Sequence, residues 1–84
     1  FEKDLPAGVA MKLFDFYEYV VENAFDGLRY LLARFFYRDN CYYACIDAVC
    51  GLDLSTLQTE EISVSKSDEN CYTLSFKVEG GDGR

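Results

Sequence analysis

The chain has 84 residues and a formal net charge of −7, from 15 acidic and 8 basic side chains, and it contains no histidine. A chain of this length buries about 60 to 65% of the surface that it exposes when unfolded, which gives one hydrophobic core and little room for a large enclosed active site. The basic residues are scattered, and the apolar runs are far shorter than the roughly 20 residues that cross a bilayer, so we expect neither a nucleic-acid nor a membrane partner.

The first predicted element is a long helix over residues 7–26. Its apolar residues recur at the spacing of one helical face, at Leu13, Phe16, Tyr17, Val20 and Ala24. Asp4 and Pro6 suit its start, and Gly27 suits its C-terminal cap. A second apolar stripe on this helix is formed by Ala10, Phe14, Val21 and Phe25. We therefore expect the helix to contact a sheet on one side and another surface, such as a partner chain, on the other.

Residues 28–37 fit a helix or a strand by apolar spacing, and their aromatic density favours a strand. The turn at 38–40 leads to residues 41–49, the predicted hairpin partner. Strict alternation of apolar and polar residues predicts a second hairpin, from strands at 60–66 and 71–78. Between the two hairpins lies a loop or one helical turn with Asp53 or Ser55 as its cap.

The predicted fold is therefore α+β, with one long helix packed on an antiparallel sheet of about four strands in two layers. Because the chain begins with phenylalanine, we expect it to be a piece of a longer protein. Residues 1–79 are expected to form a single domain. The glycine-rich residues 80–84 are expected to form a flexible tail.

Four cysteines are separated by three, four and twenty residues, at Cys41, Cys45, Cys50 and Cys71. These gaps are not the usual zinc-binding spacings, and there is no histidine to complete a site. Within a strand, Cys41 and Cys45 would lie about 13 Å apart, too far for a disulfide. Reduced, buried thiols are favoured over a disulfide or a metal site, and they indicate a cytoplasmic protein.

The sequence offers few groups for catalysis. Without histidine there is no Ser-His or Cys-His pair, and the six glycines form no phosphate-binding loop. Four carboxylates follow one side of the predicted helix, at Asp15, Glu18, Glu22 and Asp26. They predict a solvated acidic face, with an acid–base pair as the alternative. Asn23, in the same helix, either makes a local hydrogen bond or binds a ligand.

Residues 19–26, Tyr-Val-Val-Glu-Asn-Ala-Phe-Asp, resemble the helix motif of the histidine-kinase-type (GHKL) ATPase superfamily. In that family an Asn-Ala pair closes the helix, and the asparagine holds the magnesium ion of bound ATP. The resemblance implies that Asn23 is the magnesium ligand. Tyr19 stands where the family has an asparagine or a glutamate base, and Glu18 is one residue out of register.

The family's next motif is Asp-x-Gly-x-Gly, which reads the adenine, and residues 47–51 are similar to it. The resemblance implies that Asp47 and Gly51 contact the nucleotide, although Val49 replaces the first glycine. About ten residues separate Gly51 from the last hairpin, which leaves no room for the family's nucleotide lid.

The resemblance thus implies a shortened domain without nucleotide or catalytic residues, as at the end of a bacterial sensor histidine kinase. Such a module would act in signalling by docking another domain of its parent protein or a second copy. One alternative is a working ATP- and magnesium-binding domain whose lid is supplied elsewhere. A purely structural domain is the other.

Overall fold

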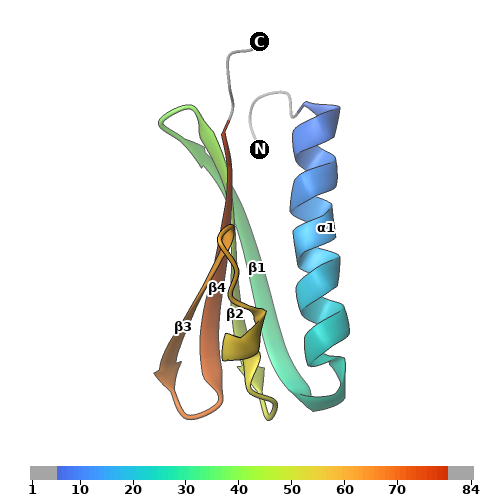
Figure 1. Ribbon diagram of the computed structural model, residues 1–84, viewed down its shortest axis with the longest axis vertical. Helices are drawn as coiled ribbons and strands as arrows, with labels where there is room; N and C mark the ends of the chain where they lie inside the picture. The colour runs from blue at the N-terminus through green and yellow to red at the C-terminus, as the bar shows by residue number, and fades with distance from the viewer. Residues whose placement is uncertain (1–5, 80–84) are drawn as a thin grey trace.

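The computed structural model describes residues 6–79, which form one helix lying along a four-stranded sheet (Figure 1). In chain order the elements are helix α1 (Ala7–Ala24), 3₁₀ turn η1 (Phe25–Gly27), strands β1 (Leu28–Arg38) and β2 (Cys41–Cys50), 3₁₀ turn η2 (Leu54–Leu57), and strands β3 (Ile62–Asp68) and β4 (Cys71–Glu79). The predicted two-layer α+β fold is confirmed. Asp4 and the predicted tail at 80–84 lie outside the described residues. Among residues 6–79, no helix is both long and apolar enough to span a membrane.

Strand β1 occupies the region whose apolar spacing also fits a helix. It pairs with β2 from Arg38↔Cys41 to Leu28↔Cys50, with one irregularity near Leu28. The two residues between the strands, Asp39 and Asn40, have φ angles of 55° and 64°. Two successive positive φ angles are typical of a type I′ turn, whose twist matches that of the paired strands. Hairpin pairing therefore decides the conformation of this ambiguous segment.

The sheet is antiparallel throughout, and its strand order is β1-β2-β4-β3. The hairpins β1–β2 and β3–β4 each pair strands that are adjacent in sequence. Pairing of β2 with β4, from Cys41↔Glu79 to Val49↔Cys71, joins the two hairpins. As a result β1 and β3 are the edge strands. Strand β3 begins at Ile62 opposite Phe76, so β4 extends beyond it.

The core lies between α1 and one face of the sheet. The helix contributes Leu13, Phe16, Val20 and Ala24, which confirms four of the five residues of the predicted inner face, while Tyr17 is half-buried. From β2 come alternate residues, Tyr42, Ala44, Ile46, Ala48 and Cys50. The ring of Phe16 stacks on Phe76 of β4 with 5.1 Å between centroids. The helix covers this face only, as Figure 1 shows.

Gly27 does not cap α1, contrary to the prediction. The helix ends at Ala24, and Phe25 in its C-cap position has right-handed helical angles. Gly27 instead ends η1, where its carbonyl oxygen accepts a hydrogen bond of 2.9 Å from the Gly51 amide. A Cβ at position 27 would lie 2.8 Å from Leu52 Cγ and 3.0 Å from Leu52 N. Glycine is needed here because two backbone segments approach closely, not because the backbone is left-handed.

The segment between the hairpins contains the predicted helical turn, η2, and Asp53 is its N-cap. The Asp53 carboxylate accepts hydrogen bonds from the hydroxyl and the backbone N–H of Ser55. These two bonds, the hydroxyl first, hold the pKa of Asp53 below its ordinary value of 3.8. Leu54 and Leu57 are thereby fixed in the core.

We expect Asp53→Ala to lower the midpoint of thermal unfolding in neutral buffer, because η2 loses its cap. The charged carboxylate stabilises the fold fully above the pKa of the unfolded chain, and this stabilisation is lost as pH falls through the lower pKa of the folded chain. The difference between wild type and Asp53→Ala should therefore shrink in strong acid, as followed by circular dichroism. Asp53→Asn is the control, because its cap carries no titrating charge. A difference that does not change with pH would contradict this role.

Candidate functional site

Asn23, the predicted magnesium ligand, lies in the last turn of α1 and is exposed. Its amide nitrogen Nδ2 donates a hydrogen bond of 2.8 Å to the carbonyl oxygen of Tyr19, one turn earlier. This bond is the local contact that the sequence offered as the alternative to ligand binding. It accounts for an asparagine near the end of the helix.

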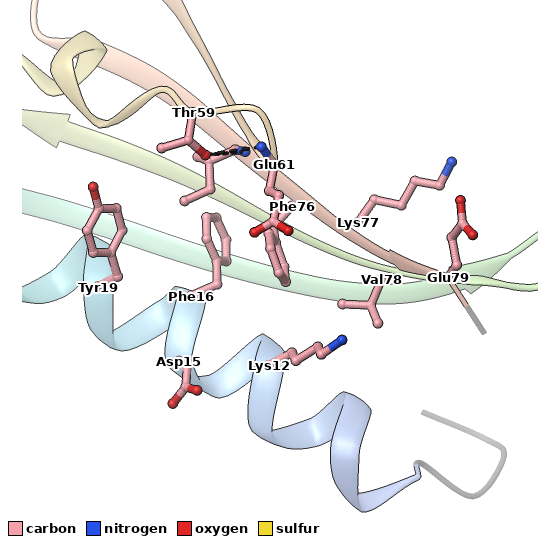
Figure 2. A pocket seen from close by; sticks show the side chains of 11 residues that line it. Lys12, Asp15, Phe16, Tyr19, Thr59, Glu61, Phe76, Lys77, Val78 and Glu79 are labelled. Atoms are coloured by element: carbon pink, nitrogen blue, oxygen red, sulfur yellow. Dashed lines mark hydrogen bonds between the residues drawn. The ribbon is translucent and has the colours of Figure 1, made fainter. Parts of the chain in front are cut away.

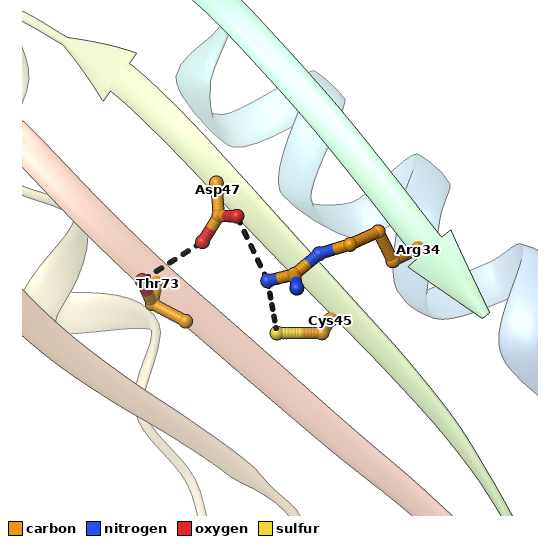
Figure 3. Close-up of polar contacts among 4 residues, drawn as sticks. All are labelled: Arg34, Cys45, Asp47 and Thr73. Carbon is orange, nitrogen blue, oxygen red and sulfur yellow. Dashed lines mark hydrogen bonds and ion pairs between the residues drawn. The ribbon is translucent and has the colours of Figure 1, made fainter. Parts of the chain in front are cut away.

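Asp47, the predicted adenine-binding residue, is held in a network across three strands (Figure 3). Its Oδ2 lies 2.8 Å from a guanidinium nitrogen of Arg34 on β1. Its Oδ1 accepts a hydrogen bond of 2.9 Å from the hydroxyl of Thr73, directly opposite on β4. The same Arg34 nitrogen lies 3.4 Å from Cys45 Sγ. Both carboxylate oxygens are thus engaged, and the network ties β1, β2 and β4 together.

The structure does not bring Asn23 and Asp47 together. The buried residues of β2 face α1, and Asp47 alternates with them, so its side chain points away from the helix. Figure 3 shows it on the side of the sheet opposite α1. Gly51 follows the end of β2, and its amide binds the Gly27 carbonyl. Asp47 therefore does not share a common space with Asn23, and the three predicted nucleotide contacts do not converge.

The carboxylates at 15, 18, 22 and 26 are all exposed along the helix. Within residues 6–79, none of them forms an ion pair, and the pairs present are Arg34–Asp47 and Arg38–Asp39. This arrangement matches the predicted solvated acidic face. We call Asp15, Glu18, Glu22 and Asp26 the acidic row.

The four cysteines are free thiols in different surroundings. Cys50 is fully buried where α1 and β2 end; its Sγ lies 3.6 Å from the Ala24 carbonyl oxygen and accepts a hydrogen bond from the Leu52 amide. Cys41, Cys45 and Cys71 are half-buried on the strands. In the part of the chain that the structure describes, no three His, Cys, Asp or Glu side chains are grouped as metal ligands.

An open groove of about 680 Å³ lies between α1 and the end of β4 (Figure 2). Phe16, Phe76, Ile62 and Val78 form its apolar floor, and charged side chains, among them Lys12 and Glu61, lie around it. Tyr19 also lines this groove, whereas Asn23 and Asp47 do not. The groove exists because β3 begins only at Ile62. Sequence reasoning missed it, since it placed the start of that strand at residue 60.

The face of the sheet away from α1 is divided by chemistry. On β1 it carries Tyr30, Leu32 and Phe36, all exposed, with Arg34 between Leu32 and Phe36. Phe36 stacks on Tyr43 of β2 at 5.0 Å between centroids. On β3 and β4 the same face carries Ser63, Ser65, Thr73 and Ser75. We call Tyr30, Leu32, Phe36 and Tyr43 the outer sheet patch. A sheet face that is fully exposed to water is expected to be polar over all its strands. Here only the half formed by β3 and β4 is polar.

Comparison of the chain with models of protein families, with curated proteins and with solved structures found no match.

Proposed function

We propose that this chain is a non-catalytic interaction module for signalling, similar to a shortened histidine-kinase-type ATPase domain, which docks another domain of its parent protein or a second copy. The observation that carries this proposal is the outer sheet patch. Tyr30, Leu32 and Phe36 project from one edge strand onto a face that no other described element covers. Exposed apolar side chains gathered on one face and bordered by polar residues are typical of protein interaction sites.

The arrangement of the predicted nucleotide contacts supports the non-catalytic part of the proposal. Asp47 uses both oxygens in the sheet, and Asn23 bonds its own helix on the other side of that sheet. We place the protein in the cytoplasm, because free thiols that are only half-buried persist in a reducing compartment.

Calorimetric titration with ATP and magnesium tests the absence of nucleotide binding. We expect no saturable heat, because the predicted contacts do not converge. Saturable binding that is lost in Asn23→Ala or Asp47→Ala would overturn this part of the proposal and establish the ATP-binding alternative.

The docking part is tested at the outer sheet patch. A photo-crosslinking amino acid at position 32 of the whole parent protein should link to a second domain or a second copy. The same group at position 65, on the polar half of that face, should not. Light scattering distinguishes the two partners, since only a second copy raises the mass of the isolated chain with concentration. A monomer at high concentration without crosslinks at position 32 would refute the docking function.

A further inference from the structure

The outward side of α1 is a second apolar surface, separate from the outer sheet patch. Met11, Phe14 and Phe25 are 66%, 58% and 72% exposed, and Val21 is half-buried beside them. At about 100° per residue these four side chains fall within an arc of about 80° on the helix. We call Met11, Phe14, Val21 and Phe25 the outer helix stripe. The predicted second stripe had Ala10 at this end, but Ala10 is half-buried and Met11 is the exposed residue. No described residue covers this side of the helix.

The spacing of the outer helix stripe is that of a helix–helix contact. Positions 11, 14, 18, 21 and 25 are separated by three, four, three and four residues, which is the alternation of a coiled-coil seam. Four of these positions are apolar, and the central one is Glu18. Phe25 directly follows α1, as the first residue of η1, and its backbone has right-handed helical angles. The occupant that fits such a seam is another helix, over about four turns.

The acidic residues near the outer helix stripe indicate which kind of helix could dock there. Glu18 stands within the seam, and the other three members of the acidic row lie along one margin of it. No described cation neutralises these carboxylates, and Lys12, the one basic residue of α1, lines the groove on another side of the helix. A docked helix would remove Glu18 from water, which is costly unless the partner supplies a Lys or Arg opposite it.

A second copy of α1 does not fit this requirement. Glu18 is the midpoint of the seam, so in-register parallel pairing and two-fold antiparallel pairing both place one Glu18 against the other. Two carboxylates facing each other in an interface repel. We therefore propose that the outer helix stripe docks a basic amphipathic helix of a different protein segment, with a Lys or Arg at the centre of its apolar seam and further basic residues along one margin. This inference rests on the proposed interaction function and names the partner of one surface.

The test uses a synthetic helical peptide with leucine at the seam positions, lysine at the centre and lysines along one margin. Fluorescence anisotropy should show saturable one-to-one binding that weakens with salt. Phe14→Ala and Phe25→Ala should each weaken binding about tenfold or more, because they remove the two large aromatic anchors of the seam. Phe36→Ala, in the outer sheet patch, is the matched control and should leave binding unchanged. A scrambled peptide of the same composition should bind far more weakly.

A charge exchange makes the test independent of folding. Glu18→Lys should abolish binding of the peptide with central lysine, and a peptide with glutamate at its centre should then bind the variant. Equal binding of the scrambled peptide, or no effect of Phe14→Ala, would overturn the proposal. Concentration-dependent dimers that Phe14→Ala dissolves would assign the surface to a second copy instead. Crosslinking at position 32 tests the outer sheet patch separately, so failure here leaves that result intact.

Discussion

Phe16→Ala is expected to lower the free energy of unfolding by about 3 to 5 kcal/mol, the range for removal of a buried aromatic side chain. Phe16 is 3% exposed, and its ring stacks on Phe76 at the contact between α1 and β4. Truncation removes apolar burial and leaves a cavity in the floor of the groove. Small domains have a free energy of unfolding of only about 5 to 15 kcal/mol, so this substitution should remove much of the stability of the fold. Urea unfolding followed by circular dichroism measures the change.

Phe14→Ala is the matched control, because it removes the same side chain two residues away on the same helix. Phe14 is 58% exposed, so we expect a change within about 0.5 kcal/mol, the usual size for surface substitutions. A large loss of stability at position 14 would mean that the outer helix stripe is covered in the isolated chain. Equal effects at the two positions would contradict the orientation of α1.

Gly27→Ala is expected to destabilise the fold by about 1 to 3 kcal/mol, the cost of forcing extra atoms into a packed site. The new methyl group would meet the side chain and the backbone nitrogen of Leu52. The Leu52 side chain can rotate away, but the backbone contact cannot be relieved without disturbing the hydrogen bond from Gly51 to Gly27. Differential scanning calorimetry should show a lower midpoint.

At the other end of α1, Gly8→Ala is expected to have the opposite effect on stability. No atom lies within 4 Å of a Cβ built there. Because alanine is the better helix former by about 1 kcal/mol in a helix interior, the substitution should stabilise the protein slightly. A stabilising effect of Gly27→Ala as well would show that residues 27 and 52 do not approach closely.

Most of the fold could be predicted because its local signals agree with its tertiary pairing. The alternation from Tyr72 to Val78 shows which residues of β4 enter the core, and Asp39 and Asn40 suit the tight turn that pairs β1 with β2. The end of α1 was predicted wrongly because Gly27 is required by its close approach to Leu52, far along the chain, which no local pattern reveals. The contact between Gly27 and Leu52, rather than local helix propensity, explains the glycine at this boundary.

The candidate site was harder to predict, because β2 carries apolar side chains on both faces. Ile46 and Val49 are similar side chains, yet one is fully buried and the other lies on the face of Asp47. The sequence of β2 therefore does not show which way Asp47 points, and its separation from Asn23 is visible only in three dimensions. The groove depends on Thr59, whose hydroxyl accepts hydrogen bonds from the amides of Glu61 and Ile62 before β3 begins.

The strand order also determines how the sheet can assemble in time. Each hairpin closes between neighbours in sequence, so both can form early and independently. Pairing of β2 with β4 joins segments from Cys41 to Glu79, and it requires the intervening chain to close a loop first. The slow step of folding should therefore be the docking of two preformed hairpins. Substitutions between β2 and β4, such as at Ile46, should therefore slow folding, because they weaken contacts that form during this docking.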